Sequence, residues 1–230
     1  ASRADAIVLQ ETKRAGLASC TEAEQAARGV KWTVAVSPAL VTGDGGISSG
    51  VAVGARSHIG MLTPVAATGD DAVDASRFAI QTIGAVCHGG VHLGSLYLEH
   101  TAGICSAVNA DTLQAVAGVL RRLVGPWIIG ADWNDTPAAL IQSGWLDLVD
   151  GVVVAPNAPT CRASGKVYDF FVVSRSLAHA VVGVRALADA GPWPHNPSRI
   201  YLRAGSRAIM IRQLQRPKGF GAALPFGPDP

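Results

Sequence analysis

This sequence of 230 residues has few charged residues and no long apolar run. No apolar run reaches the roughly 18 residues that a membrane-spanning helix needs, and no hydrophobic signal core follows residues 1–5. We therefore expect a soluble chain without a membrane partner. Only 16% of the residues are charged whereas 49% are hydrophobic, which argues against a disordered chain and favours a globular one.

Closely spaced cysteines are also missing. Cys20, Cys87, Cys105 and Cys161 are widely separated, and none forms a C-x-x-C pair. Zinc ligands usually lie at short spacings, so the pattern disfavours a zinc site. Reduced thiols are typical of intracellular proteins, and we expect the chain in the nucleus or the cytoplasm.

The net charge of +2 is unevenly distributed along the chain. Residues 1–189 hold 13 Lys and Arg against 16 Asp and Glu, whereas residues 190–230 hold six basic residues against Asp229 alone. The end of the chain is also rich in proline and glycine, so we expect one domain over 1–205 and a basic extension over 206–230. Such an extension is either an electrostatic footprint for phosphate backbones or a solvated tail.

Short apolar runs alternate with turns, in keeping with 26 glycines and 13 prolines. The runs predict strands over residues 6–9, 32–36, 50–54, 78–83, 91–98, 127–130, 167–173, 180–184 and 199–202. An apolar stripe predicts a helix over 111–123, ended by Gly125 and Pro126, and a short helix is expected over 138–141. Strands with helices between them indicate a layered α/β sandwich.

Acidic, amide and imidazole side chains recur at the ends of these apolar runs. Catalytic groups gather where strands end at one rim of a sandwich, so we expect these side chains to lie together. Taken alone, each has a plainer interpretation, such as a surface carboxylate, a helix cap or a loop histidine. The residues are Glu11, Asp132, Asn134, Asp169 and His195.

The order and spacing of these elements over residues 5–203 resemble the endonuclease/exonuclease/phosphatase superfamily. Residues 9–12 are similar to that family's metal-binding Q-E element, and residues 129–134 to its G-D-x-N element. Residues 168–174 look like its D-Y/F-x-x-x-S strand, residues 195–197 resemble its closing S-D-H-x-P element, and Tyr97 resembles a tyrosine that ends a core strand. The resemblance implies a four-layered αββα sandwich, in which two packed mixed sheets are flanked by helices.

The resemblance also implies a metal-dependent reaction. Glu11 would hold Mg²⁺ or Mn²⁺, because a hard cation screens the phosphodiester anion and polarises its oxygens. Asp132 would orient the attacking water, and Asn134 would donate a hydrogen bond within the cluster.

Three further residues would act on the phosphate itself. His195 would stabilise charge on the phosphoryl oxygens. Asp169 would bond the other ring nitrogen of His195 and fix its tautomer. Tyr97 would contact the phosphate through its hydroxyl.

Three features depart from the family's pattern. Pro194 stands directly before His195, where the family has an aspartate, and nothing in the sequence shows that nearby Asp189 replaces it. The family's domains open with an asparagine-bearing strand ahead of the Q-E strand, and we expect this chain to lack that first strand. His100 stands where a nuclease often places an asparagine. These departures favour a weakened or degenerate enzyme, such as the nuclease domain of a longer retroelement polyprotein.

Three functions remain open from the sequence. The first is an endonuclease that hydrolyses phosphodiester bonds, with DNA as the foremost partner. The second is a phosphatase or phosphodiesterase that acts on an inositol phosphate or a sphingolipid, and the third is an inactive nucleic-acid-binding remnant. The basic residues after position 190 favour nucleic acid, but residue identities do not separate the first two functions because substrate choice in this family lies in loops.

Overall fold

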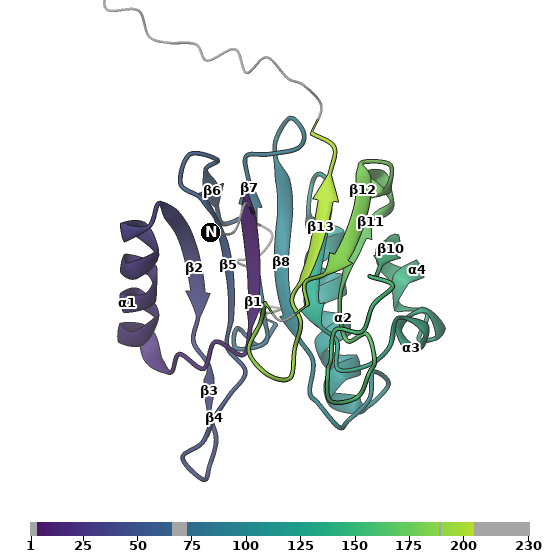
Figure 1. The fold of residues 1–230 in the computed structure, drawn as a ribbon, viewed down its shortest axis with the longest axis horizontal. Helices are drawn as coiled ribbons and strands as arrows, with labels where there is room; N and C mark the ends of the chain where they lie inside the picture. Colours follow the sequence, from purple (N-terminus) through teal and green to yellow (C-terminus); the bar gives the residue numbers. More distant parts are fainter. Residues whose placement is uncertain (1–3, 66–72, 189, 205–230) are drawn as a thin grey trace, which may run out of the picture.

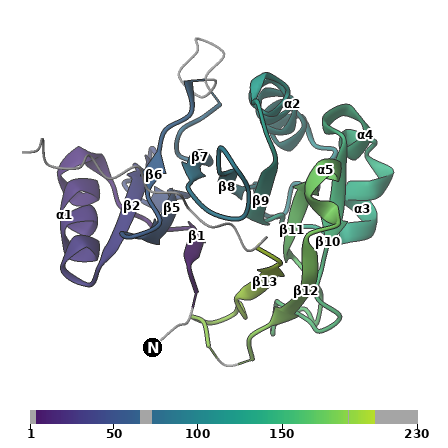
Figure 2. The same cartoon turned by 90° about the horizontal axis from the view of Figure 1, so that it is seen from above.

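The computed structural model describes residues 4–65, 73–188 and 190–204. Two layers of strands pack face to face, and helices cover both outer faces, as Figures 1 and 2 show. The predicted αββα sandwich is therefore confirmed. The extension predicted over 206–230 lies outside the described residues. No helix in the described ranges is long and apolar enough to span a membrane.

The larger layer is a six-stranded mixed sheet in the order β10-β11-β9-β8-β7-β6. Only the central β8–β9 pair is parallel, and the other pairs are antiparallel. The strands are β6 (Met61–Leu62), β7 (Phe78–Ile83), β8 (Val91–Tyr97), β9 (Trp127–Asp132), β10 (Gly151–Val154) and β11 (Asp169–Ser174).

The smaller layer consists of two separate pieces. An antiparallel sheet in the order β1-β5-β2 lies beside the β12–β13 pair, while β3 and β4 form a projecting hairpin. Among the described residues, β1 pairs only with β5 and β13 pairs only with β12. The strands are β1 (Ala6–Gln10), β2 (Trp32–Ser37), β3 (Leu40–Val41), β4 (Ile47–Ser48), β5 (Val51–Arg56), β12 (Val181–Ala186) and β13 (Ser198–Leu202).

Helices form the two outer layers. α1 (Gly16–Gly29) lies against β2 of the smaller layer. α2 (Ala107–Arg122), α3 (Pro137–Gln142) and α4 (Trp145–Val149) lie beside the larger sheet, and the short α5 (Arg175–Ala178) follows β11 (Figure 2). The nine predicted strands and the short α3 lie within two residues of their predicted bounds, whereas β3, β4, β6 and β10 were not predicted.

Four helices differ from the prediction, and two of them, the short α4 and α5, were simply not predicted. α2 begins at Ala107 and not at Asp111, because Ser106 caps the backbone N–H of Asn109 and the buried Asn109 amide binds the loop before it. α1 was not predicted, since only Cys20 on it is fully buried and the apolar stripe is weak. Its four alanines carry the helix propensity that could have revealed it.

Two apolar clusters hold the layers together. Between the sheets, Val53 of β5 packs with Val91, Ile128 and Phe171 of the larger sheet. On the other face of the larger sheet, buried side chains of α2 such as Val116 pack against the strands. Each fully buried aliphatic side chain contributes about 1.5–3 kcal/mol, so the larger sheet, which is buried on both faces, is the rigid base of the molecule.

Candidate active site

The register of the larger sheet aligns three polar residues at what we call the rim, the edge where β8 and β9 end. Tyr97 is the partner of Asp132 in the parallel β8–β9 ladder, and Asp132 is the partner of Asp169 in the antiparallel β9–β11 ladder. Partners in a ladder project their side chains to the same face of the sheet. Pairing over long distances in sequence thus brings a tyrosine and two carboxylates together.

A buried tryptophan holds the end of β9. The Trp133 indole is fully buried, stacks on Phe170 with 5.1 Å between ring centroids, and donates to the Phe170 carbonyl at 3.1 Å. The next residue, Asn134, is left-handed with a φ of 49°, a conformation that asparagine tolerates. Its backbone N–H donates to Oδ1 of Asp132 at 3.1 Å, so the turn restrains the catalytic candidate Asp132.

His195, in the loop between β12 and β13, reaches both carboxylates. Its Nδ1 lies 2.8 Å from Oδ2 of Asp169, and its Nε2 lies 3.9 Å from Oδ2 of Asp132. The backbone of His195 forms a bridge with Cys161, and the Ser198 hydroxyl donates to the Asp169 carbonyl at 2.6 Å. The expected contact between Asp169 and His195 is therefore present, on a loop that is tied down on both sides.

This arrangement shifts the pKa values of both His195 and Asp132. The hydrogen bond to Asp169 is the main cause that raises the pKa of His195 to about 9, in opposition to burial. Burial, followed by repulsion from Asp169, raises the pKa of Asp132 to about 7. Near neutral pH, His195 is protonated and its Nε2–H can be donated, while Asp132 is close to the midpoint of its titration.

Glu11 joins the cluster from β1. Gln10 fastens the end of that strand, because its Nε2 donates to Ser95 Oγ at 2.9 Å and to the Gly130 carbonyl at 3.0 Å. Glu11 follows with a φ of 52°, and its carboxylate accepts a hydrogen bond from Tyr97. Burial, this hydrogen bond and the nearby carboxylates raise the pKa of Tyr97, so its hydroxyl keeps its proton.

One cleft of about 430 Å³ contains most of these groups. Glu11, Asp132, Asp169 and His195 line it, whereas Tyr97 and Asn134 lie outside its lining. The Asn134 side-chain amide donates to the Leu98 carbonyl at 2.8 Å, outside the carboxylate cluster. The expected hydrogen bond from Asn134 within the cluster is thus made by its backbone and not by its side chain.

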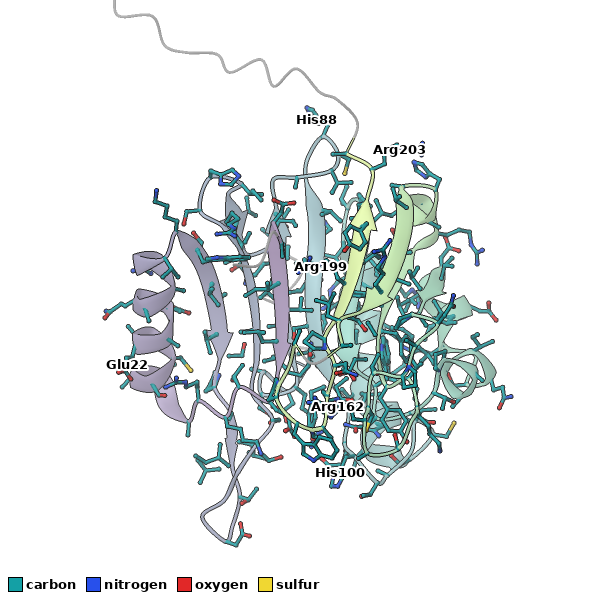
Figure 3. The ribbon with its side chains drawn as sticks, in the orientation of Figure 1. Glu22, His88, His100, Arg162, Arg199 and Arg203 are labelled. Carbon is teal, nitrogen blue, oxygen red and sulfur yellow. The ribbon has the colours of Figure 1, made fainter. Side chains whose placement is uncertain are left out.

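Two of the departures noted in the sequence, Pro194 and His100, lie at this same end of the molecule. Pro194 lines the cleft beside His195, and its carbonyl accepts the backbone N–H of Arg162 at 2.9 Å. His100 is exposed, and Figure 3 shows it at the same end of the sandwich as Arg162. Asp189, which was considered as a replacement carboxylate, lies outside the described residues.

The sequence analysis overlooked an aromatic residue at the cleft. Trp193 is 71% exposed although it lines the cleft, and the Arg162 guanidinium lies 5.2 Å from its ring centre. A tryptophan between two prolines in a glycine-containing loop was the available signal. Exposed aromatic rings stack with nucleobases, which makes Trp193 a candidate for substrate contact.

A second overlooked residue is Arg77, behind Tyr97. Its guanidinium lies 5.9 Å from the Tyr97 ring centre and forms ion pairs with Glu99 and Asp74. The backbone N–H of Tyr97 also donates to the Arg77 carbonyl at 2.9 Å. Arg77 therefore restrains Tyr97 through both its guanidinium and its backbone carbonyl, which the sequence pattern alone did not indicate.

The fold of this chain resembles those of several solved nucleases. The endonuclease domain of TRAS1, a telomere-specific non-LTR retrotransposon, is 17% identical, with a TM-score of 0.56 and coverage of 86% of this chain and 99% of that one. The 3′–5′ exonuclease NExo from Neisseria meningitidis is 16% identical, with a TM-score of 0.60 and coverage of 86% and 89%.

An AP endonuclease from Leishmania major is 15% identical, with a TM-score of 0.60 and coverage of 86% of this chain and 78% of that one. No sequence-family model and no curated protein matches the chain. At these identities the structural likeness establishes the fold.

Proposed function

We propose that this chain, which has the fold of the endonuclease/exonuclease/phosphatase superfamily, is a divalent-metal-dependent nuclease that hydrolyses phosphodiester bonds in DNA. The observation that carries the proposal is the convergence of Glu11, Asp132 and the Asp169–His195 pair on one cleft. A protonated imidazole beside several carboxylates suits a reaction in which an anionic substrate gains charge in the transition state.

The residues present fit a hard divalent cation. Carboxylate oxygens are the preferred ligands of Mg²⁺ and Mn²⁺, and the cleft gathers several of them around the buried Asp132. Oxygens of Asp132 and Asp169 and a nitrogen of His195 lie within 4.8 Å of one another. Because His195 is protonated near neutral pH, we assign the cation to the carboxylates, with Glu11 as its main ligand and Asp132 beside it.

The bound cation would screen the phosphodiester and polarise its oxygens. Asp169 holds the Nδ1–H of His195, which leaves the Nε2–H to donate to a phosphoryl oxygen. Asp132 lies in the cleft and accepts a hydrogen bond from the attacking water, which orients that water toward the phosphorus. Tyr97 keeps its proton as a hydrogen-bond donor, and Glu11 accepts that bond before substrate arrives.

DNA is the substrate that we favour, for two reasons. Trp193 is an exposed aromatic residue that lines the cleft, and the Arg162 guanidinium lies over one face of its ring. A ring that stacks on a base and a cation near the backbone form a typical nucleic-acid contact. In addition, one similar structure, of the 3′ phosphatase NExo from Neisseria, is bound to a product DNA hairpin.

A nicking assay tests the proposal. Supercoiled plasmid is incubated with the full chain and Mg²⁺, Mn²⁺ or EDTA, and the relaxed form is measured. We expect nicking with either metal ion and none with EDTA. Absence of nicking with both metal ions, from a correctly folded chain that still binds DNA, would instead favour an inactive binding remnant, an outcome that Pro194 beside His195 makes worth testing.

A further inference from the structure

The β12–β13 pair has two chemically different faces. Val184 of β12 and Ile200 of β13, which are partners in the ladder, pack on the apolar cluster between the sheets. Because side chains alternate along a strand, the positions on either side of these two residues point outward, away from the larger sheet. We call this outer surface the arginine face. It consists of Gly183, Arg185, Arg199 and Tyr201.

No helix of the described ranges covers the arginine face. α1 packs against β2 at the other edge of the smaller layer, and Figures 1 and 2 show no described helix over the outer side of β12 and β13. Arg185 is exposed, and Tyr201 is 40% exposed. An exposed tyrosine has an apolar ring and a polar hydroxyl, which suits it to contact a partner.

Two arginines stand directly opposite each other on this face. Arg185 of β12 and Arg199 of β13 are partners in the antiparallel ladder. Like charges in opposed positions of a ladder repel each other and destabilise the strand pair. Within the part of the chain that the structure describes, no carboxylate forms an ion pair with Arg185. A local arrangement that lowers stability in the folded protein indicates a functional surface, and two adjacent cations indicate an anionic partner.

Arg203 extends the row of cations beyond the end of β13. Its backbone N–H donates to the Ala180 carbonyl at 2.8 Å, which continues the ladder by one step. Arg199, Tyr201 and Arg203 are therefore spaced two residues apart, about 7 Å for each step. Figure 3 shows Arg199 and Arg203 along β13. Cation, aromatic ring and cation thus follow one another along the strand.

The space beside Tyr201 is open on the β12 side. Its partner across the ladder is Gly183, and a β carbon added at Gly183 would meet no atom within 4 Å. The Arg185 guanidinium lies 5.9 Å from the centre of the Tyr201 ring. The ring therefore has a cation nearby, while the position opposite it carries no side chain. A second flat ring fits such a space and stacks on the tyrosine.

We propose that the arginine face, together with Arg203, binds single-stranded nucleic acid. One base stacks on Tyr201 in the space beside Gly183, and the arginines contact phosphates on either side of that base. Cations along the backbone and aromatic rings under the bases are the combination by which proteins bind single strands with little sequence preference. A duplex keeps its bases paired and stacked, so it has no free base for Tyr201.

The arginine face begins at the cleft. Ser198, the residue before Arg199, lines the cleft, and its hydroxyl donates to the Asp169 carbonyl at 2.6 Å. A strand on the arginine face therefore continues from the cleft in which cleavage is proposed, and this step alone rests on the proposed function. A substrate with a single-stranded segment beside the cleaved bond would be held in both places.

Binding of a fluorescent oligothymidylate of about 12 nucleotides to the full chain, measured by anisotropy in EDTA, tests the proposal. Tyr201→Ala should weaken binding about tenfold, because one stacked base is lost. Arg185→Gln should reduce the slope of log affinity against log salt by about 0.7, because one phosphate contact is lost. The matched control Arg121→Gln, on the exposed surface of α2, should change neither quantity. Unchanged binding by the Tyr201 and Arg185 variants overturns the proposal.

An oligonucleotide of the same length without bases separates stacking from charge. Arg185→Gln should weaken its binding, whereas Tyr201→Ala should not. Gly183→Val removes no polar group and suits a strand, so it should fold normally and weaken binding of the strand with bases only. Equal losses for both oligonucleotides in the Tyr201 and Gly183 variants, with the fold checked by circular dichroism, overturn the assigned stacking.

Two further outcomes decide the partner. Polyglutamate that competes as well as the oligothymidylate would mean a general polyanion surface and overturn the proposal. Because EDTA prevents metal-dependent cleavage, binding is measured apart from activity. Nicking by the wild type with no binding loss in the variants would overturn this proposal alone, whereas the expected binding losses without any nicking would overturn the nuclease proposal alone.

Discussion

The pair formed by Asp169 and His195 yields a quantitative prediction. Asp169→Asn keeps an acceptor for the Nδ1–H of His195 but removes the negative charge that raises the His195 pKa to about 9. The pKa should fall toward the ordinary value of 6.5, with Asp132 keeping part of the elevation. At pH 8 the protonated fraction of His195 would drop from about 90% to about 3% if the whole elevation were lost.

If the protonated imidazole stabilises the transition state, nicking at pH 8 should therefore fall by up to about 30-fold, while nicking at pH 5.5 should change much less. The His195 pKa is measured from the pH dependence of its ring NMR signals, and nicking is measured at both pH values. Asp111→Asn on the exposed surface of α2 removes the same charge away from the cleft and serves as the control. An unchanged His195 pKa, or an equal loss of activity at both pH values, would refute the reasoning.

Three further predictions concern the cleft. Glu11→Gln should abolish metal-dependent nicking, because a carboxamide lacks the charge that a hard cation requires. The control Glu22→Gln, on the exposed face of α1 (Figure 3), should have no effect. Unchanged nicking by the Glu11 variant would remove Glu11 from the site. Pro194→Asp should raise nicking, up to the about 10²–10³-fold that one transition-state partner is worth, with the fold checked by circular dichroism; no gain means that the missing carboxylate does not limit the reaction. Trp193→Ala should weaken DNA binding, measured by fluorescence anisotropy, by about 1–3 kcal/mol if its ring stacks on a base, and unchanged affinity would exclude that contact.

The sequence predicted the positions of most strands because the patterns that indicate a strand are local. Apolar runs that end in polar residues identified strands such as β9 and β11 to within two residues at each end. The boundary of α2 was less accurate, because its cap depends on Ser106 and on the contacts of Asn109 with a distant loop. α1 escaped because a helix that packs on a sheet with small residues shows little hydrophobic periodicity.

By itself, the sequence determined which polar side chains stand at the ends of apolar runs, and with them the candidate residues Glu11, Asp132 and Asp169. Only the tertiary structure decided how these side chains meet. The ladder that aligns Tyr97, Asp132 and Asp169 depends on strand pairing between segments far apart in the chain, which no local pattern encodes. The pKa values of His195 and Asp132 likewise follow from burial and from charges that folding brings within reach, and these have no counterpart in the unfolded chain.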